Sequence, residues 1–410
     1  MSITKTVPKI RRKVLIGNYA VAEAVKLARA QVIAAYPITP QTLIVEKLAE
    51  MVEKGELNAK FIRIESEHSA LAAVLGAAAG GARAFTATSS HGLLYMYEVV
   101  WWAANARLPM VMAIVTRSIA PPWNIHSDHN DLLSIRDSGW IISMAENVQE
   151  AFDLTLQGFK ISEDERVLLP FAVGLDAFQL SHTAEVVDIP DQRVVDEWLP
   201  PRNPYIPYVV EPGQKFTVGN MGPDEYTMEL RWHMYEATER AKRVIKEVDK
   251  DYAKISGRSY GGLVEYYKTS DAKYIVVIMG AWSGDAKEAV DKLRDEGIPI
   301  GLLRLRFIRP FPLEELREVA NGAKAFIVID RAMSMGYQGI LGIEVSATVN
   351  DLVQIRNVIA GLGGVDVSID DFYKIFKKHI DSIEKGEIIK PISIDWYLPW
   401  FKNRAQSNRY

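Results

Sequence analysis

Cysteine is absent from the sequence of 410 residues. This absence excludes disulfides, a thiolate nucleophile and cysteine-held zinc or iron–sulfur clusters within the polypeptide. An excess of positive charge is also missing, because 48 basic residues face 52 acidic ones, and this balance argues against nucleic-acid binding. No uncharged apolar run approaches the ~18 residues of a membrane span, and no apolar signal core follows the start. We therefore expect a soluble, cytoplasmic protein that binds neither nucleic acid nor membranes.

A P-loop and a Rossmann G-x-G-x-x-G fingerprint are missing as well. Apolar residues make up 48% and charged residues 24% of the chain, a composition typical of globular proteins. At ~150 residues per domain, the length predicts roughly two to three domains.

Apolar strands alternate with helical patterns in two stretches of the chain. The first stretch has strands over 32–35, 61–64, 84–87, 110–115 and 167–173, and helices over 42–54, 68–80 and 93–106. The second has strands over 274–279, 300–305 and 325–329, and helices over 285–296 and 313–320. This alternation predicts the α/β class, with two doubly wound parallel-sheet domains. We place the domains at 1–245 and 270–410, with a linker at 246–269.

Two segments look irregular. The range 200–223 contains six prolines and three glycines, which predicts an arm without regular structure inside the first domain, followed by a charged helix over 224–253. The start of the chain is basic, and we interpret it as a solvated arm; its charges are Lys5, Lys9, Arg11, Arg12 and Lys13.

Ligands of open parallel sheets bind beyond the carboxyl ends of the strands, so the residues after each strand are candidate site residues. After the strand at 32–35, two prolines enclose Thr39 and suit either a binding loop or a plain turn. Glu65 and Glu67 follow the next strand and begin a helix rich in alanine and glycine. The helix dipole favours a carboxylate there and burial would raise its pKa, although a solvated acidic helix end is equally compatible. The neighbouring His68 alone predicts little.

The next two strand ends carry hydroxyls and an arginine. The segment from Thr88 to Gly92 reads Thr-Ser-Ser-His-Gly and offers either hydrogen-bond donors to a ligand or a plain helix cap. Arg117 can clamp a carboxylate through two parallel hydrogen bonds, or form a surface salt bridge with Asp128 or Asp131. The loop 121–131 has two histidines and two aspartates, but their spacing fits no tight metal motif and also suits a polar subunit contact. The glycines at 361–364 indicate a simple tight turn.

Several segments, taken in order, resemble the alpha subunits of the 2-oxoacid:ferredoxin oxidoreductases, most closely those acting on pyruvate. These are YPITPQT at 36–42, ESEHSA at 65–70, TATSS at 86–90, DHND at 128–131 and RPFP at 309–312. The resemblance covers nearly the whole chain. It implies a first domain like the pyrimidine-binding domain of thiamine diphosphate enzymes and a second like the carboxyl-terminal domain of transketolase.

The resemblance also implies roles for single residues. Glu67 matches the family glutamate that hydrogen-bonds the aminopyrimidine ring of thiamine diphosphate. Thr39 and Arg117 match residues that hold the carboxylate and carbonyl of the substrate, so these three are the candidate catalytic residues. The candidate cofactor-binding residues are Glu67, Tyr36, Pro37, Ile38, Ser89 and Ser90. No metal ligand is expected in this chain.

Part of the family's machinery is missing from the sequence. No G-D-G segment with a following asparagine is present to hold magnesium and the diphosphate, and there is no cysteine for [4Fe–4S] clusters. The resemblance therefore places these groups in partner chains, the beta, gamma and delta subunits, with coenzyme A as co-substrate and ferredoxin as electron acceptor. We expect the isolated chain to be inactive.

The implied reaction is the oxidative decarboxylation of pyruvate with coenzyme A to acetyl-CoA and CO₂, with reduction of ferredoxin. Relatives acting on branched-chain 2-oxoacids such as 2-oxoisovalerate share YPITPQT, and the loop 121–126 departs from the usual pyruvate-enzyme sequence, so a branched-chain substrate stays open. Thr39 disfavours oxalate. A 2-oxoacid dehydrogenase subunit would lack YPITP, and a non-catalytic α/β binding module is the remaining hypothesis.

Overall fold

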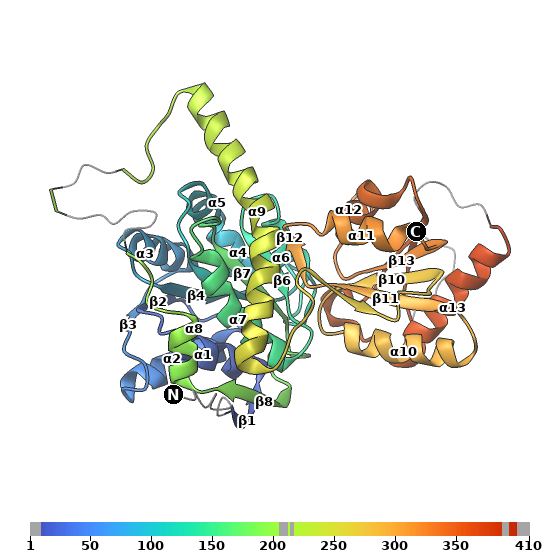
Figure 1. Cartoon of the computed structure of the whole chain (residues 1–410), viewed down its shortest axis with the longest axis horizontal. Helices are drawn as coiled ribbons and strands as arrows, with labels where there is room; N and C mark the ends of the chain where they lie inside the picture. The colour runs from blue at the N-terminus through green and yellow to red at the C-terminus, as the bar shows by residue number, and fades with distance from the viewer. Residues whose placement is uncertain (1–9, 205–211, 214–216, 388–392, 400–410) are drawn as a thin grey trace, which may run out of the picture.

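Two α/β domains lie side by side in the computed structural model (Figure 1), which describes residues 10–204, 212–213, 217–387 and 393–399. The first is built on a seven-stranded sheet of order β12-β6-β7-β5-β4-β2-β3. Its strands are β2 (Val32–Ala35), β3 (Lys60–Arg63), β4 (Ala84–Thr88), β5 (Val111–Thr116), β6 (Ile141–Met144), β7 (Phe171–Asp176) and β12 (Phe307–Arg309). All are parallel except β12, which pairs antiparallel with β6.

Helices cover both faces of this sheet (Figure 1). One face carries α1 (Gly17–Leu27), α2 (Thr42–Glu53) and α7 (Val148–Ser162). The other carries α3 (Glu67–Ala79), α4 (Ser90–Tyr95), α5 (Tyr97–Asn105) and α6 (Asn130–Ser134). Because both faces are covered, the central strands β5 and β7 are buried at every residue, which explains their continuous apolar sequences.

The second domain has a six-stranded sheet of order β15-β14-β13-β10-β11-β9. Its strands are β9 (Val264–Tyr267), β10 (Tyr274–Ile278), β11 (Ile300–Leu305), β13 (Ala325–Asp330), β14 (Gln354–Ile359) and β15 (Ser393–Trp396). Only β9 is antiparallel to its neighbour. The helices α10 (Ser283–Asp295) and α13 (Ile369–Glu384) pack on one face, and α11 (Leu313–Ala320) and α12 (Ile340–Val349) on the other. The α/β class and the two parallel-sheet domains are confirmed.

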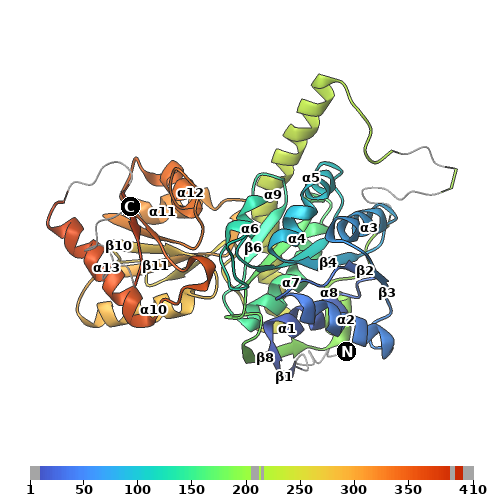
Figure 2. The ribbon, with the colours of Figure 1, turned by 180° about the vertical axis from the view of Figure 1, so that it is seen from behind.

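Between the domains, the described residues of the proline-rich arm are irregular, as the sequence predicts. The helix α9 (Asp224–Ser256) follows, and its first turns extend beyond the body of the protein in both views (Figures 1 and 2). It ends before Gly257, whose φ of 74° suits glycine. The range 246–269 therefore contains the end of α9 and strand β9.

Two expectations of local structure need correction. The side chains of Arg11 and Arg12 in the basic start are exposed, as expected, but this segment is not a free arm, because β1 (Ile10–Ile16) pairs antiparallel with β8 (Ala184–Pro190); residues 1–9 lie outside the described residues. The helix expected over 93–106 is divided at Met96 into α4 and α5. A further helix, α8 (Gln192–Trp198), follows β8. Residues Leu362–Gly364 form a short 3₁₀ turn after Gly361, confirming the tight turn.

The carboxyl-end edges of the two sheets face each other across a buried ion network. Asp176 ends β7, and its carboxylate accepts hydrogen bonds from His129, Ser127 and Arg331 at 2.8 Å each. It also accepts from the backbone N–H of Ala281, after β10, at 2.8 Å. Arg331 follows β13 and belongs to the second domain, so this single carboxylate links both domains.

The chain itself forms a second link between the two domains. Directly after β11 the chain crosses to the first sheet, where β12 adds an edge strand beside β6. The buried carboxylate of Glu150 on α7 holds the crossing, because it pairs with both Arg304 and Arg306 at 2.6 Å. No helix among the described residues has the length and apolar character needed to cross a membrane.

The network at Asp176 predicts the effect of removing its charge. Asp176→Asn should lower the free energy of unfolding by about 3–5 kcal/mol, because Arg331 then stays buried without its counter-charge. The control Asp188→Asn removes an exposed ion pair with Arg12 and should cost less than about 1 kcal/mol. Denaturant unfolding measures both, and equal losses would contradict the assignment.

The same network has a pH signature. Burial alone would raise the pKa of Asp176, but His129 and Arg331 hold that pKa well below its ordinary value. A carboxyl with a lowered native pKa stabilises the fold at neutral pH, and this contribution is lost as the pH falls below about 4. Wild-type stability should therefore fall more steeply below this pH than that of Asp176→Asn.

Candidate functional site

Four loops that follow parallel strands meet at one edge of the first sheet. The strands β3, β2, β4 and β5 are adjacent in that order, so their carboxyl ends lie side by side. The segments after them carry Glu67, Thr39, Ser89 and Arg117, respectively. The fold therefore brings the candidate segments together at the edge where open parallel sheets bind ligands.

Glu67 is the first residue of α3, and only 8% of its surface is exposed. The helix is capped instead by Ser66, whose hydroxyl accepts from the backbone N–H of Ser69 at 3.2 Å. The Glu67 side chain forms no hydrogen bond or ion pair with the described residues. Glu65, by contrast, is exposed and accepts from the Ser69 hydroxyl. The solvated acidic helix end is therefore Glu65, and Glu67 is a buried carboxylate.

The start of α4 closes one side of this carboxylate. A Cβ built on Gly92 would lie 2.7 Å from Oε1 of Glu67 and 2.6 Å from Oγ1 of Thr88, so a larger residue would displace both. The hydroxyls of Thr88 and Ser89 are buried and lack a hydrogen-bond partner in the part of the chain that the structure describes. Buried polar groups without partners at a strand end indicate a ligand. Ser90 is different, since its hydroxyl donates to the carbonyl of Ser118 at 2.6 Å.

Arg117 directly follows β5 and is 3% exposed. Its Nη1 donates to the carbonyl oxygen of Thr39 at 2.6 Å, and its Nη2 lies 2.9 Å from Nδ1 of His91. The indole of Trp123 covers the guanidinium at 4.5 Å. No carboxylate of the described chain pairs with this side chain, so the surface salt bridge with Asp128 or Asp131 is not formed.

The electrostatics of Arg117 follow from this placement. Burial lowers the pKa of its guanidinium, and the Asp131 and Glu67 carboxylates act in the opposite direction. Glu67 is thus within electrostatic range of Arg117. A buried guanidinium without a counter-ion is suited to bind an anion.

The loop with Thr39 is fixed by hydrogen bonds to its backbone. The side chain of Gln41 donates to the carbonyl of Tyr36 at 2.7 Å, and that of Asn18 donates to the carbonyl of Pro40 at 2.9 Å. The Thr39 side chain itself is exposed, as are Tyr36 and Pro37 beside it, and Ile38 is half-buried. A held backbone with exposed side chains is the arrangement expected of a binding loop.

Asp131 holds two of these strand ends in place. It is fully buried, and its carboxylate accepts from the backbone N–H groups of Ser90, Arg117 and Leu132 at 2.8, 2.9 and 2.7 Å. The sequence did not predict this role, because backbone N–H donors leave no trace in residue identity. The signal that the sequence offered was the segment DHND at 128–131, which carries part of the family resemblance but does not show what Asp131 binds.

The rest of the loop 121–131 connects the domains. The backbone N–H of His129 donates to the carbonyl of Arg331 at 2.8 Å, and Asn130 exchanges two hydrogen bonds of 3.0 Å with the backbone of Met333. The two histidines diverge, since His126 packs on Phe178. In the described chain, no group of three or more acidic or histidine side chains could hold a metal ion.

One sequence pattern has no catalytic context. Residues 257–261 read G-R-S-Y-G and match the G-x-S-x-G pattern of hydrolase nucleophiles. They lie between α9 and β9, not between a strand and a helix. The Ser259 hydroxyl donates to Asp249 at 2.6 Å, which is not the histidine that a nucleophilic serine needs.

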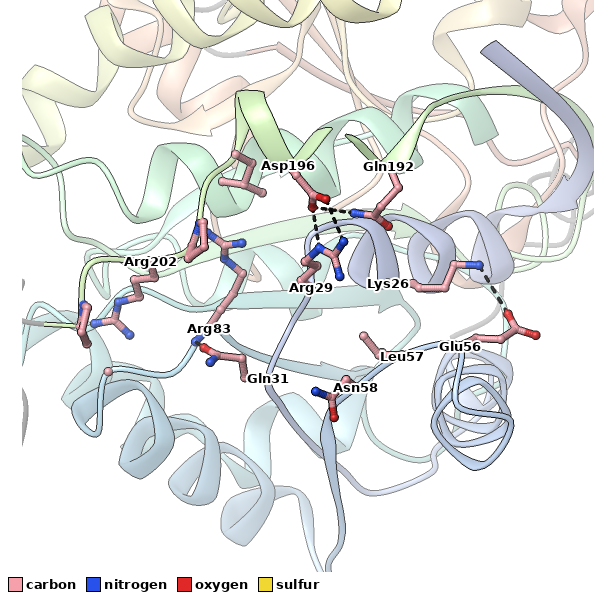
Figure 3. A pocket seen from close by; sticks show the side chains of 14 residues that line it. Lys26, Arg29, Gln31, Glu56, Leu57, Asn58, Arg83, Gln192, Asp196 and Arg202 are labelled. Carbon is pink, nitrogen blue, oxygen red and sulfur yellow. Dashed lines mark hydrogen bonds and ion pairs between the residues drawn. The ribbon is translucent and has the colours of Figure 1, made fainter. Parts of the chain in front are cut away.

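A cavity of about 570 Å³ lies at the opposite, amino-terminal edge of the sheet (Figure 3). Its basic lining residues are Lys26, Arg29, Arg83 and Arg202. Arg29 is paired with Asp196 through two hydrogen bonds of 2.5 and 2.8 Å, drawn in Figure 3, and Arg83 with Glu163 through two of 2.7 and 2.6 Å. Since acidic side chains already neutralise Arg29 and Arg83, this cavity is less suited to bind an anion than the site around Arg117.

The contact between Gly92 and Glu67 predicts an overpacked variant. Gly92→Ala should lower the free energy of unfolding by about 1–3 kcal/mol, because its Cβ displaces Glu67 and Thr88. The control Gly76→Ala lies in α3 with open space around its Cβ and should stabilise the chain by up to about 1 kcal/mol. Urea unfolding compares the two, and a stabilising Gly92→Ala would show that the gap is open.

Comparison with known proteins shows the family of the chain. Residues 23–250 match the model of the pyruvate flavodoxin/ferredoxin oxidoreductase thiamine-diphosphate-binding domain, and residues 272–372 match core domain II of pyruvate:ferredoxin oxidoreductase. In fold, the chain resembles a 2-oxoglutarate:ferredoxin oxidoreductase from Magnetococcus marinus, with a TM-score of 0.69 and 19% identity. That match covers 90% of this chain and 65% of the other. It also resembles a split-gene transketolase, with a TM-score of 0.52, 12% identity and coverage of 90% and 99% of the two chains.

Closer relatives are similar along almost their whole length. The pyruvate synthase subunit PorA of Pyrococcus horikoshii is 48% identical, over 93% of this chain and 97% of its own. The PorA of Methanocaldococcus jannaschii is 46% identical, over 92% and 95%. The ketoisovalerate oxidoreductase subunit VorA of Pyrococcus abyssi is 44% identical, over 94% and 97%. With a family model over more than half of its length and relatives of this similarity, the chain belongs to the pyruvate flavodoxin/ferredoxin oxidoreductase family.

Proposed function

We propose that this chain is the subunit of a thiamine-diphosphate-dependent 2-oxoacid:ferredoxin oxidoreductase that holds the pyrimidine side of the cofactor and the carboxylate of the substrate. One observation carries the proposal. At a single sheet edge, Arg117 is buried without a carboxylate partner and Glu67 is buried without a hydrogen-bond partner, among the described residues. Buried charges are costly unless a partner completes them, and a bound cofactor and substrate would do so.

The residues at this edge fit the aminopyrimidine end of thiamine diphosphate. Glu67 offers an unpaired carboxylate to a ring nitrogen, and on one side it packs closely against Gly92. The unused hydroxyls of Thr88 and Ser89 offer further hydrogen bonds, and we propose cofactor contacts for Ser89, Ser90 and the exposed backbone at 36–38. When bound, the cofactor supplies the carbanion chemistry of decarboxylation, while the protein orients it.

Arg117 and Thr39 would hold the substrate. The guanidinium matches a carboxylate in geometry and charge, and the exposed Thr39 hydroxyl is free to donate to an oxygen of the 2-oxoacid. The Thr39 carbonyl meanwhile holds Arg117. The loop and the strand end therefore position each other.

The chain offers no sign of the other half of the reaction. It has no cysteine for iron–sulfur clusters and no G-D-G segment for magnesium and diphosphate. We propose that beta, gamma and delta partner subunits in the cytoplasm supply these groups, bind coenzyme A and pass electrons to ferredoxin. The two units of this chain, 1–245 and 270–410, would dock together against them.

We propose pyruvate as the substrate. The PorA relatives, named for pyruvate synthase, reach 48% identity. The VorA relatives reach 46%, so 2-oxoisovalerate is a second candidate. Competition between the two 2-oxoacids in the assembled complex decides between them.

Arg117→Met should raise the KM for pyruvate by one to three orders of magnitude, because a charge-assisted contact in a desolvated pocket is worth about 2–4 kcal/mol. Thr39→Val should raise the KM less, by up to about tenfold, since one neutral hydroxyl is lost. Steady-state kinetics of the assembled complex measures both. A lower melting temperature with unchanged KM in Arg117→Met would make the arginine structural.

Glu67→Gln should leave assembly intact but slow hydrogen–deuterium exchange at C2 of the bound cofactor by about a hundredfold or more, because an amide cannot share a proton with the ring. The matched control is Glu65→Gln, two residues away, whose side chain is exposed and should leave exchange unchanged. Exchange at the wild-type rate in Glu67→Gln would refute its role.

A further inference from the structure

His91 lies in the first turn of α4 and joins the residues around Arg117 into one cluster. Its Nδ1 is 2.9 Å from Nη2 of Arg117, and its Nε2 is 2.8 Å from the backbone N–H of Ala120. Its ring meets the indole of Trp123 edge-on, with centroids 5.2 Å apart. The same indole covers the guanidinium. Imidazole, guanidinium and indole are thus in mutual contact.

The hydrogens of Arg117 can be counted. Nη1 and Nη2 each carry two, and one of each is directed to the Thr39 carbonyl and to His91. Nε is buried and has no partner in the described chain. One hydrogen on each terminal nitrogen remains, and these two can be donated to the two oxygens of a carboxylate.

The guanidinium of Arg117 is directed at Nδ1 and the backbone N–H of Ala120 at Nε2, and both groups can only donate. A neutral imidazole accepts at only one of its nitrogens. We assign the acceptor to Nδ1, because a hydrogen bond from the charged guanidinium is stronger than one from a backbone N–H; Nε2 then carries the ring hydrogen, and the N–H of Ala120, an exposed residue, is left without this acceptor. Burial and then the charge of Arg117 lower the pKa of His91, which keeps the ring neutral and accepting.

We propose that His91 is a positioning residue for the substrate site: its Nδ1 holds Nη2 of Arg117 so that the two terminal nitrogens present a paired donor fork to the carboxylate of the 2-oxoacid. This inference rests on the proposed function of Arg117. It adds that the fork depends on an acceptor at residue 91 and not on Arg117 alone. His91 touches neither the reacting carbonyl nor the cofactor in this role, so it acts on substrate capture and not on the chemical step.

The test uses the assembled complex with His91→Leu, which removes the acceptor, and His91→Asn, which restores an oxygen near the position of Nδ1. His91→Leu should raise the KM for pyruvate about tenfold with kcat within about twofold, and His91→Asn should recover most of the loss. The affinity for oxamate, an unreactive analogue of pyruvate, should fall in parallel when it is measured by calorimetric titration. The control His233→Leu changes an exposed histidine on α9 and should leave all values unchanged.

Three results would overturn the inference: an unchanged KM in His91→Leu, equal loss in His91→Leu and His91→Asn, or a fall in kcat and melting temperature without a change in oxamate binding. Arg117→Met, measured alongside, distinguishes failure of the positioning role of His91 from failure of the proposed function of Arg117. If it raises KM while His91→Leu does not, only the positioning role fails. If Arg117→Met leaves KM unchanged, the substrate clamp itself fails.

Discussion

The carboxylate of Asp131 fixes the backbone on which the candidate site is built. It accepts from the N–H groups of Ser90 and Arg117, the residues that follow β4 and β5, and from that of Leu132. One buried side chain therefore sets the path of two neighbouring strand ends. Gly92, whose small size lets α4 pack closely against Glu67, lies in the helix that begins at Ser90. The positions of both candidate charged groups thus depend on Asp131.

The charge state of Asp131 affects the electrostatic environment of Arg117. Burial, followed by the nearby Asp128 carboxylate, raises the pKa of Asp131 to about 8, against the backbone donors that favour the charged form. Near neutral pH it therefore carries less than a full negative charge. It also contacts Arg117 only through the backbone, while the guanidinium is directed to Thr39 and His91. The guanidinium keeps its positive charge for a ligand because the carboxylate of Asp131 is engaged by backbone N–H groups.

Sequence periodicity predicted most of the parallel strands but missed β6 and β15, and it placed the strand that became β7 several residues too early. The rule on strand ends selected the segments that the fold brings together. The strand expected at 32–35 matches β2 in full, because its four apolar residues follow a polar glutamine and end just before the Tyr36-Pro37 segment. Periodicity could not predict β12, since three residues carry no pattern and their pairing is with the other domain. Nor could it predict the contact of Arg117 with His91, which depends on how far β4 and β5 extend before their loops turn. Residue type identified the candidates, and only the tertiary structure showed which of them lack partners.

Two buried arginines of the described chain lie over a tryptophan ring, and their difference shows what makes one of them a candidate site. Arg331 lies 4.1 Å from the centre of Trp282, and Arg117 lies 4.5 Å from that of Trp123. Both are buried and cost the fold a desolvated charge. Arg331 recovers this cost through the Asp176 carboxylate and so joins the domains. Arg117 has only a carbonyl and an imidazole, which are neutral. The loop that carries Trp123 is in turn held by the second domain, since Asn124 donates to the carbonyl of Gly363 at 2.7 Å. Arg331, which Asp176 neutralises, therefore helps to build the interface between the domains that covers Arg117. A ligand with a carboxylate would give Arg117 the counter-charge that Asp176 gives Arg331.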